Sequence, residues 1–457
     1  MPQKQRTVLY ITRYYRPSTS AAGIRAGNFV DALLQRNLHV IVVTVGSQAK
    51  IEKVSDQLTV CWVSLDGRLP CEMDGQDRRW PWWSVLPGPD PPGKSSKTIY
   101  RACQWLIEQY RPNLVFVTGP PFSLMALTCE LAAIYHLPMI LEFRDAWYTA
   151  MPWPYKNVLE RRSAKRWERR CVSSATKIIT VTDAYRQILI DTFGPGIARK
   201  TTTIRHGFDA CDIDKQPASA NNRHTDKDKK TFTIAHIGQL RGFDIVEAKV
   251  LLRVFRTIIH TLKRIFVGAN FCEKLRLDWM CPHYLMKAVS QVASVNGDFA
   301  RYVRLVFAGE KFPQIDTWAQ KMNLAENIEQ YGPLPPEQAW QLALQADLLV
   351  LTLYGIKNCS YHWCVPSKIY TYLATGNPVL ALLPPGEARD LVTEAGTAII
   401  AAPDDPCAIA KQLSRLFHEH TSGITSVRGN WDYIRQFELT IQQNKFADVI
   451  LSVLADD

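Results

Sequence analysis

The sequence predicts an α/β protein made of two Rossmann-like, doubly wound domains that face each other across a cleft. Two observations carry this prediction. The chain has 457 residues, more than one compact core usually holds, and short apolar runs rich in β-branched residues recur along it, several of them separated by helical patterns. Such runs are typical of buried parallel strands. Because doubly wound sheets bind ligands at the carboxyl ends of their strands, we expect the active site at the cleft.

The predicted strands fall into two series. The first series occupies residues 7–12, 39–45, 114–119, 139–143 and 177–182. The second series occupies residues 232–238, 303–309, 347–353 and 377–383. Both series consist of short apolar runs, as expected for strands that helices cover on both faces.

A polar stretch broken by Pro217 separates the two series and has the composition of a linker. We therefore expect four parts along the chain. They are an N-terminal domain over 1–208, a linker over 209–230, a C-terminal domain over 231–425, and a helical segment over 426–457 that packs back on the N-terminal domain.

Composition excludes several classes of protein. With 47% hydrophobic and 21% charged residues, the chain is neither disordered nor fibrous. No apolar run reaches the roughly 18 residues that span a bilayer, and the first six residues are too polar to begin a signal peptide, so we expect a cytoplasmic protein. The eleven cysteines are scattered and form no CxxC pair, which indicates neither a zinc site nor a disulfide framework.

The net charge of +11 points to a polyanionic partner, and the basic residues are concentrated between Lys156 and Arg170. This run carries seven cations against only Glu160 and Glu168. As a helix it would lie on anionic headgroups at roughly 1 kcal/mol per well-placed cation, which predicts a peripheral position on the inner face of a membrane. A solvated helix face explains the run equally well. We expect no nucleic-acid partner, because no nucleic-acid motif accompanies the charge.

Two further stretches are less informative. Residues 251–266 repeat apolar residues at helical spacing, which favours a helix that covers the second sheet over one that docks on a membrane. Residues 269–298 carry no recognisable motif and are interpreted as an insertion.

Several segments together resemble one known family. They are the opening 8–44, with its proline-containing glycine loop, then 141–147, 202–209, 234–242, and most closely VPSKIYTYLATGNPVLA at 365–381. In sequence and order they are similar to the retaining glycosyltransferase family 4, also called group 1. The resemblance implies the GT-B fold. It also implies transfer of a sugar, with retention, from a nucleotide-sugar donor to an acceptor such as a cell-surface glycan or a lipid-linked precursor. The opening lacks the GxGxxG of dinucleotide-binding folds, which argues against a dehydrogenase.

The VPSK motif has a direct physical meaning. Pro366 fits the first turn of a helix, where the amides that follow it are free to bind an anion. Lys368 would add a full positive charge where the leaving diphosphate gathers negative charge. The resemblance implies that Ser367 and Lys368 contact the donor. An ordinary proline-capped helix is the alternative.

The chain departs from the family at two positions. Thr371 replaces the glutamate whose carboxylate would accept hydrogen bonds from both ribose hydroxyls, and Trp363 replaces an earlier glutamate of many relatives. These changes are consistent with a different donor contact, a divergent branch or an impaired enzyme. The second hypothesis for function is therefore a degenerate GT-B protein that binds a sugar nucleotide or a partner without turnover.

Four further residues complete the predicted site. Gly23 would let the first loop approach the donor, although a plain strand-to-helix turn is equally possible. Asp145 follows a predicted strand and is the candidate for orienting or deprotonating the acceptor, with a helix cap as the alternative. Gly238 and Arg241 follow the first strand of the second domain, where the family often places basic residues on the diphosphate. Because helix amides and basic side chains can neutralise a diphosphate, we expect no metal ion and no cofactor.

A pair of acidic residues, Asp404 and Asp405, lies outside this predicted site. The two carboxylates belong to a PDDP turn, and we expect them to serve that turn.

Overall fold

The computed structural model describes residues 5–73, 94–150, 155, 157–210, 231–247, 275–424 and 426–455. They form two compact units. The first unit contains the described residues up to His206 together with those from Thr440 onward, and the second contains those between Gly207 and Leu439. Most of the predicted linker and the predicted helix over 251–266 lie outside the described residues.

The first unit is built on a sheet of eight strands in the order β3-β4-β2-β1-β5-β6-β7-β8. Its strands are β1 (Thr7–Ile11), β2 (His39–Gly46), β3 (Lys50–Lys53), β4 (Leu58–Ser64), β5 (Leu114–Gly119), β6 (Met139–Phe143), β7 (Lys177–Thr180) and β8 (Thr201–Thr203). All neighbours pair in parallel except β3, which runs antiparallel to β4. The five strands predicted for this half are confirmed to within two residues at their ends. Strands β3, β4 and β8 were not predicted.

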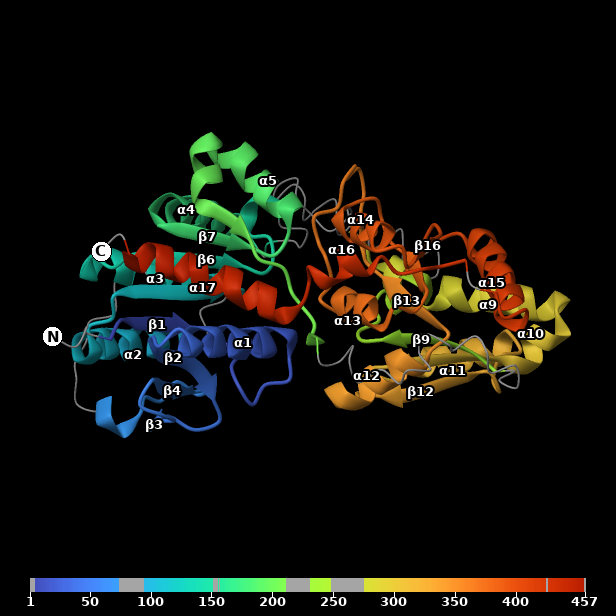
Figure 1. Cartoon of the computed structure of the whole chain (residues 1–457), viewed down its shortest axis with the longest axis horizontal. Helices are drawn as coiled ribbons and strands as arrows, with labels where there is room; N and C mark the ends of the chain where they lie inside the picture. The colour runs from blue at the N-terminus through green and yellow to red at the C-terminus, as the bar shows by residue number, and fades with distance from the viewer. Residues whose placement is uncertain are drawn as a thin grey trace. The chain divides into compact units, whose positions relative to one another are not determined.

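Helices cover the first sheet. They are α1 (Ala21–Gln35), α2 (Lys94–Tyr110), α3 (Phe122–Tyr135), α4 (Val158–Ser174), α5 (Asp183–Phe193) and the last helix of the chain, α17 (Leu439–Ala455). Figure 1 shows α17 running alongside α1, and the ring of Phe446 stacks on Phe29 with 4.0 Å between ring centroids. Phe446 also meets Phe116 of β5 edge-on, so the last helix belongs to the core of the first unit.

The second unit contains a parallel sheet of six strands in the order β12-β11-β9-β13-β15-β16. Its strands are β9 (Phe232–Ile237), β11 (Val303–Ala308), β12 (Ile328–Gly332), β13 (Leu348–Thr352), β15 (Val379–Leu382) and β16 (Ala398–Ile400). A short antiparallel pair joins β10 (Leu275–Arg276) to β14 (Gly355–Ile356). The four strands predicted for this half are confirmed, again to within two residues.

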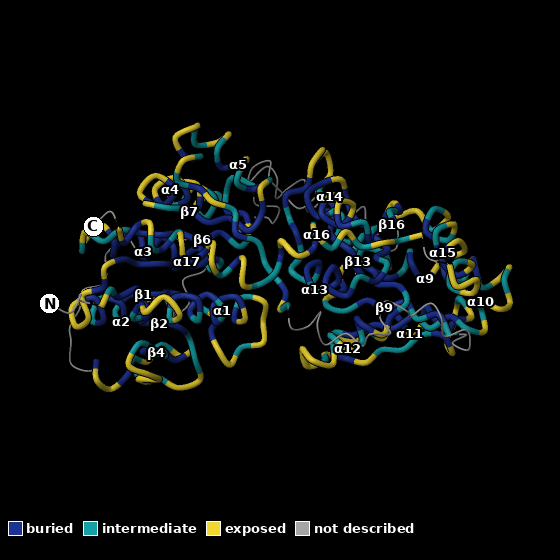
Figure 2. The backbone as a smooth tube through the Cα atoms, in the orientation of Figure 1, coloured by how far each residue is buried: buried dark blue, intermediate teal, exposed yellow. Residues whose placement is uncertain are grey.

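The helices of the second unit follow its strands in the manner of a doubly wound fold. They are α7 (Phe243–Glu247), α9 (His283–Val295), α10 (Gly297–Tyr302), α11 (Pro313–Lys321), α12 (Pro336–Gln345), α13 (Lys368–Thr375), α14 (Glu387–Glu394), α15 (Pro406–Thr421) and α16 (Trp431–Arg435). Figure 2 shows the central strands of both sheets as buried, whereas the edge strands β3 and β12 carry exposed residues.

The interpretation of residues 269–298 as an insertion is wrong for its described part. Residues 275–298 contain α9, which buries Leu285, Met286 and Val289 in the core of the second unit. These side chains share one face of the helix and pack in the same cluster as Phe232 of β9. The segment is therefore an integral helix of the domain.

The α-helices in the described ranges are all too short or too polar to cross a bilayer.

Candidate functional site

The carboxyl ends of β9 and β11 carry two glycines that bring their loops into close contact. Gly238 follows β9 with φ of +118°, and Gly309 follows β11 with φ of +156°. A Cβ atom at Gly309 would lie 2.3 Å from the carbonyl oxygen of Gly238. Because a side chain at 309 would collide with the backbone, only glycine allows these loops to approach so closely. The loops thus present backbone at the edge of the sheet where ligands of this fold bind.

Lys368 reaches this glycine turn from the start of α13. Its Nζ lies 3.0 Å from Nε2 of His236, and a Cβ atom placed on Gly238 would lie 3.5 Å from the same Nζ. The side chain is partly buried, and burial lowers the pKa of Lys368 to about 8. No described carboxylate lies within ion-pairing distance of it. Lys368 and Gly238, both predicted, are therefore brought together, and the ammonium charge is available to an anion.

His236 was not predicted, although it belongs to this cluster. Its side chain is only 1% exposed, and Nε2 also lies 3.3 Å from Oγ1 of Thr352, at the end of β13. Burial and the nearby Lys368 lower the pKa of His236 well below its ordinary value, so the ring is neutral. The signal in the sequence was a polar residue near the end of an otherwise apolar strand.

The helix starts later in the chain than the VPSK motif predicts, because α13 begins at Lys368 and Pro366 precedes its N-cap instead of lying in its first turn. Ser367 occupies the N-cap position, but with a helical φ of −58° and ψ of −30°, and its hydroxyl makes no capping hydrogen bond. The Ile369 amide donates to the carbonyl of Pro366 at 3.1 Å. The Tyr370 amide donates to the carbonyl of Ser367 at 3.3 Å, so these two amides are not free for an anion as predicted. The helix start still has a positive dipole end, and Lys368 is its first residue.

The two positions at which the sequence predicts a departure from the family differ in their surroundings. Thr371 lies three residues after Lys368, on the same helix face, and is partly exposed. Trp363 is 5% exposed and its ring stacks near His362 with 6.1 Å between centroids. Trp363 thus packs in the interior.

Arg241 lies farther along the loop that follows β9. Its side chain is exposed, and Nη2 donates to Oε1 of Gln239 at 2.9 Å. The next residue, Gly242, has φ of +83°, and a Cβ atom there would lie 2.3 Å from the carbonyl oxygen of Leu277. No contact between Arg241 and Lys368 is described. The Lys368 ammonium contacts His236 and lies next to Gly238.

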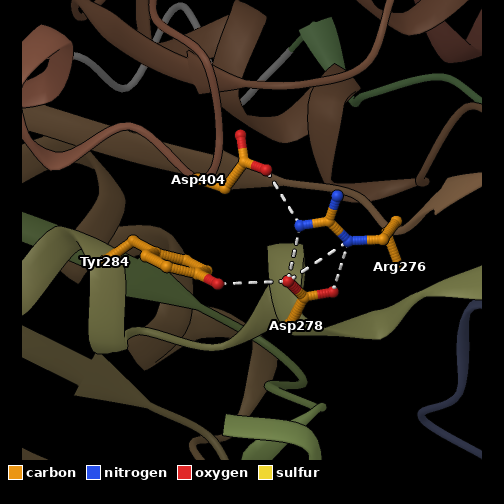
Figure 3. Close-up of polar contacts among 4 residues, drawn as sticks. All are labelled: Arg276, Asp278, Tyr284 and Asp404. Carbon is orange, nitrogen blue, oxygen red and sulfur yellow. Dashed lines mark hydrogen bonds and ion pairs between the residues drawn. The ribbon is translucent and has the colours of Figure 1, made fainter.

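An ion-pair cluster fixes the segment on which this loop rests (Figure 3). Arg276 donates from Nε to Asp278 at 3.0 Å and from Nη2 to both Asp278 and Asp404 at 2.8 Å. The hydroxyl of Tyr284 donates to Asp278 at 3.2 Å. The hydrogen bond to Asp278 is the largest cause of the raised pKa of Arg276. The Arg241 amide donates to Met280 in the same segment, so the cluster supports the loop after β9.

The acidic pair at 404 and 405 has two separate roles. Asp405 is the N-cap of α15, because its Oδ1 accepts from the amides of Cys407 and Ala408 at 3.0 Å each. This confirms the expectation that Asp405 serves the turn. Asp404 instead pairs with Arg276.

In the first unit, Gly23 lies buried in the first turn of α1. Its amide donates to Oγ of Ser20, the N-cap of the helix, at 3.1 Å. A Cβ atom at Gly23 would lie 2.7 Å from both Cβ and the carbonyl oxygen of Ser18. The glycine is therefore required by the packing of the loop before α1, which is the structural alternative considered for this residue.

Asp145 lies in the bend that follows β6. Its side chain is exposed, yet neighbouring protein atoms desolvate it and raise its pKa, while Arg144 acts in the opposite direction. Arg144 itself donates from Nε to Oγ1 of Thr118 at 2.9 Å, which holds the bend against β5. Asp145 caps no described α-helix, so the helix-cap alternative is wrong. It lies in the same unit as Gly23, and no contact between the two is described.

A buried ion pair that was not predicted lies under this edge of the first sheet. Arg25 of α1 donates from Nε to Glu142 of β6 at 2.9 Å, and the two side chains are 4% and 1% exposed. Its other nitrogens donate to the carbonyls of Ile204 and Arg205 at 2.7 Å each. Every nitrogen of this guanidinium thus has an acceptor, which offsets the cost of burying the pair.

A second buried carboxylate ties α4 to the bend at Asp145. Glu168 accepts from the Thr149 amide at 3.0 Å and from the hydroxyl of Tyr185 at 3.3 Å. Tyr185 in turn accepts from the Trp147 amide at 3.0 Å. Burial raises the pKa of Glu168 to about 7, against the opposing hydrogen bonds. Glu168 therefore titrates near neutrality and holds the chain just after Asp145.

No group of three or more His, Cys, Asp or Glu side chains in the described part of the chain could hold a metal ion.

Comparison with protein-family models gives two matches. Residues 20–206 match the glycosyl transferase 4-like domain, and residues 266–419 match the glycosyl transferases group 1 domain. The chain carries the two domains of a group 1 glycosyltransferase. The predicted resemblance is thereby confirmed, and the second match includes the segment interpreted as an insertion. A search of curated proteins found no significant match.

Solved structures with the same fold are glycosyltransferases of the GT-B class. Sucrose-phosphate synthase from Thermosynechococcus elongatus has a TM-score of 0.66 at 13% identity, with 99% of this chain and 100% of that chain covered. HepE from Anabaena in complex with UDP has a TM-score of 0.57 at 13% identity, covering 98% and 100%. WaaG, a glycosyltransferase involved in lipopolysaccharide biosynthesis, has a TM-score of 0.57 at 13% identity, covering 97% and 99%. The fold of this glycosyltransferase is GT-B.

Proposed function

We propose that this glycosyltransferase moves a hexose from a nucleotide-sugar donor to an acceptor, with retention of configuration. The observation that carries the proposal is the ammonium of Lys368, which lies at a helix N-terminus beside a glycine turn and has no described carboxylate partner. A partly buried cation in such a place is stabilised by an anion. A nucleoside diphosphate supplies one, and the structures of HepE hold UDP or UDP-glucose.

The proposed chemistry follows from the same geometry. When the glycosidic bond of the donor breaks, negative charge gathers on the leaving diphosphate. The ammonium of Lys368 and the positive dipole end of α13 stabilise that charge, which lowers the barrier to sugar departure. This arrangement can neutralise the diphosphate without a metal ion. Ser367 adds a hydroxyl that capping does not use, and Arg241 a charge farther along the loop.

On the acceptor side, we assign Asp145 to orient or deprotonate the attacking hydroxyl. Desolvation raises the pKa of Asp145, which makes the carboxylate a stronger base than an ordinary aspartate. Its position after β6, at the carboxyl edge of the first sheet, supports the assignment. The acceptor that we propose is a cell-surface glycan or a lipid-linked precursor of polysaccharide biosynthesis. WaaG, which has the same fold, is involved in lipopolysaccharide biosynthesis.

A membrane surface is the partner that we propose for α4. The predicted basic helix is present, and its exposed residues include the cations Arg162, Lys165, Arg166 and Arg169. Leu159 on the same helix is 60% exposed, so an apolar side chain accompanies the charge. A helix of this kind binds anionic headgroups, which would bring the enzyme to a lipid-linked acceptor.

A thermal-shift screen against UDP-, GDP-, ADP- and dTDP-sugars tests the donor proposal. A ligand at one hundred times its dissociation constant stabilises a native protein by about 2.7 kcal/mol, so one donor should raise the melting temperature clearly above that of the free protein. Lys368→Ala should remove most of the shift. A melting temperature that no nucleotide sugar changes would contradict the proposal.

The second candidate function is a GT-B protein that binds a sugar nucleotide without turnover. The observation that favours it is the burial of Trp363, because a packed indole cannot replace the hydrogen bonds of a carboxylate to a sugar. Thr371, where the resemblance implies a glutamate, would withdraw a second carboxylate from the donor. Stabilisation by a donor without any release of nucleoside diphosphate would support this candidate over the enzyme.

A further inference from the structure

His236 is a buried polar side chain in an apolar strand, and the chemistry proposed above gives it no role. The flanking residues of β9, Ile234 and Ala235, are fully buried, and His236 itself is 1% exposed. A polar ring in such a place costs free energy unless hydrogen bonds satisfy it. Its contacts therefore indicate why it is there.

The contacts of Nε2 determine the state of the ring. Lys368 Nζ lies at 3.0 Å and Thr352 Oγ1 at 3.3 Å from this one nitrogen. An ammonium can only donate, so Nε2 accepts and the ring proton belongs on Nδ1, which is buried and has no hydrogen-bond partner among the described residues. A protonated ring would instead place two cations 3.0 Å apart. The imidazole is thus a neutral acceptor for the lysine.

The other groups packed on this pair do not compete for the ammonium. The charged side chain that acts on His236 is Lys368 of α13, and β13 contributes the uncharged Thr352. The hydroxyl of Tyr372, also on α13, accepts from the Ile237 amide at 3.0 Å, and burial raises its pKa, so it stays neutral. At the end of β11, Gly309 contributes backbone alone.

We propose that His236 is the positioning residue of the donor site, whose neutral imidazole holds the ammonium of Lys368 beside Gly238 to receive the donor diphosphate. The inference rests on the proposed function, because the diphosphate is the ligand. It adds a residue that acts through Lys368 and that needs no contact with the donor itself.

The proposal has a consequence for pH dependence. Diphosphate binding requires the ammonium, and burial has already lowered the pKa of Lys368 to about 8. Affinity should therefore be constant below that pH and fall as pH rises through it. An acceptor on the ammonium favours the charged form, so removal of the imidazole should lower the pKa of Lys368 further and move the midpoint of the affinity curve to lower pH.

Calorimetric titration of the full chain between pH 6 and 9 tests this. The ligands are UDP, GDP, ADP and dTDP, and the tightest of the four is used for the variants. His236→Phe should weaken binding at pH 7.5 by about tenfold, the effect of roughly 1.4 kcal/mol, and should move the midpoint down by about one unit. His236→Gln should recover part of the lost affinity and part of the shift in midpoint, because a carboxamide oxygen can accept from Lys368. The control is His39→Gln, in the first unit, where His39 also lies near a threonine hydroxyl.

A folded His236→Phe protein with unchanged affinity and unchanged midpoint would overturn the inference while leaving the donor proposal intact. If the wild type binds none of the four nucleotides, the donor proposal fails and this inference fails with it. If the Phe variant does not fold, a measurement on the wild type tests the inference instead. Nitrogen chemical shifts of His236, assigned through the Gln variant, should show a proton on Nδ1 and an acceptor at Nε2, and the opposite tautomer would contradict the proposal.

Discussion

Among single residues, Lys368 has the most direct connection to function. Its position could be predicted because VPSK is a local pattern that begins a helix and places a cation at its positive end. What the pattern could not give was the partner of the ammonium. His236 is 132 residues away in the chain, and the parallel pairing of β9 with β13 brings it to the same edge of the sheet.

Removal of the Lys368 charge gives the first prediction. Lys368→Ala should weaken donor binding, or slow turnover, by roughly 1.5–3 kcal/mol, as expected for the loss of a charged contact to phosphate. Titration calorimetry and steady-state kinetics measure the two effects. Lys321→Ala, which removes an exposed lysine at the end of α11, is the matched control. Unchanged binding and rate in the Lys368 variant would remove this residue from the site.

Thr371 gives the second prediction. Thr371 is partly exposed and lies on the helix face of Lys368, so a carboxylate there would point to the same side as the ammonium. Thr371→Glu should tighten nucleotide binding several-fold, since a carboxylate accepts hydrogen bonds from both ribose hydroxyls. Calorimetry with the best nucleotide measures this. Weaker binding by a folded variant would mean that neighbouring side chains have rebuilt the pocket, at a cost of roughly 1–3 kcal/mol for the clash.

At the scale of elements, α4 combines an exposed basic face with one buried carboxylate. The sequence predicted the basic helix because the cations are local to one segment. It could not predict the role of Glu168, which depends on contacts with Thr149 and Tyr185 from other elements. The exposed and buried faces of this one helix give two separate predictions.

The exposed face of α4 predicts binding to anionic membranes. The protein should co-sediment with vesicles that contain anionic lipid, and should be released as salt rises past physiological strength. Replacing Arg162, Lys165, Arg166 and Arg169 by glutamine should abolish the binding.

The control variant has the same net charge as the α4 variant. It replaces four exposed cations of the second unit by glutamine, namely Lys287, Arg301, Lys321 and Lys411. If the two quadruple variants lose vesicle binding to the same extent, the total charge of the protein causes the binding and α4 does not. Equal binding of the wild type to neutral and anionic vesicles would contradict the proposal.

The buried face of α4 predicts a pH-dependent stability. The folded-state pKa of Glu168 is about 7, against an ordinary 4.5, so the folded protein holds this proton more tightly than the unfolded chain does. The contribution of Glu168 to the free energy of unfolding is therefore greatest below pH 4.5. It decreases as pH rises to about 7, by roughly 3 kcal/mol at most. Above that pH the contribution is constant.

Glu168→Gln should remove this slope, because a carboxamide does not ionise. Relative to the wild type, the variant should gain stability between pH 5 and pH 8, as measured by urea unfolding at both values. Glu72→Gln, at an exposed carboxylate of the same unit, should show no such gain. Parallel stability curves for the Glu168 variant and the wild type would show that Glu168 does not titrate in this range.

At the scale of the whole molecule, the sequence was sufficient for the fold class and for most strands. The strand β6 was predicted to the residue, because a short run with four apolar residues among five is typical of a strand covered on both faces. The edge strand β3 was missed, because KIEK is charged and exposed and forms a strand only by pairing with β4. The core helix α9 was missed because its apolar face is recognisable only against the cluster that it completes.

The central claim is that these two domains together form a working, nucleotide-sugar-dependent glycosyltransferase. Release of nucleoside diphosphate from UDP-, GDP-, ADP- and dTDP-sugars, measured for the wild type and Lys368→Ala with a lipid extract as the source of acceptor, tests it most directly. We predict release from at least one donor by the wild type and a rate about tenfold or more lower in the variant, which corresponds to the loss of one charged contact. Stabilisation by a donor without any release would contradict the claim and leave a protein that only binds its nucleotide.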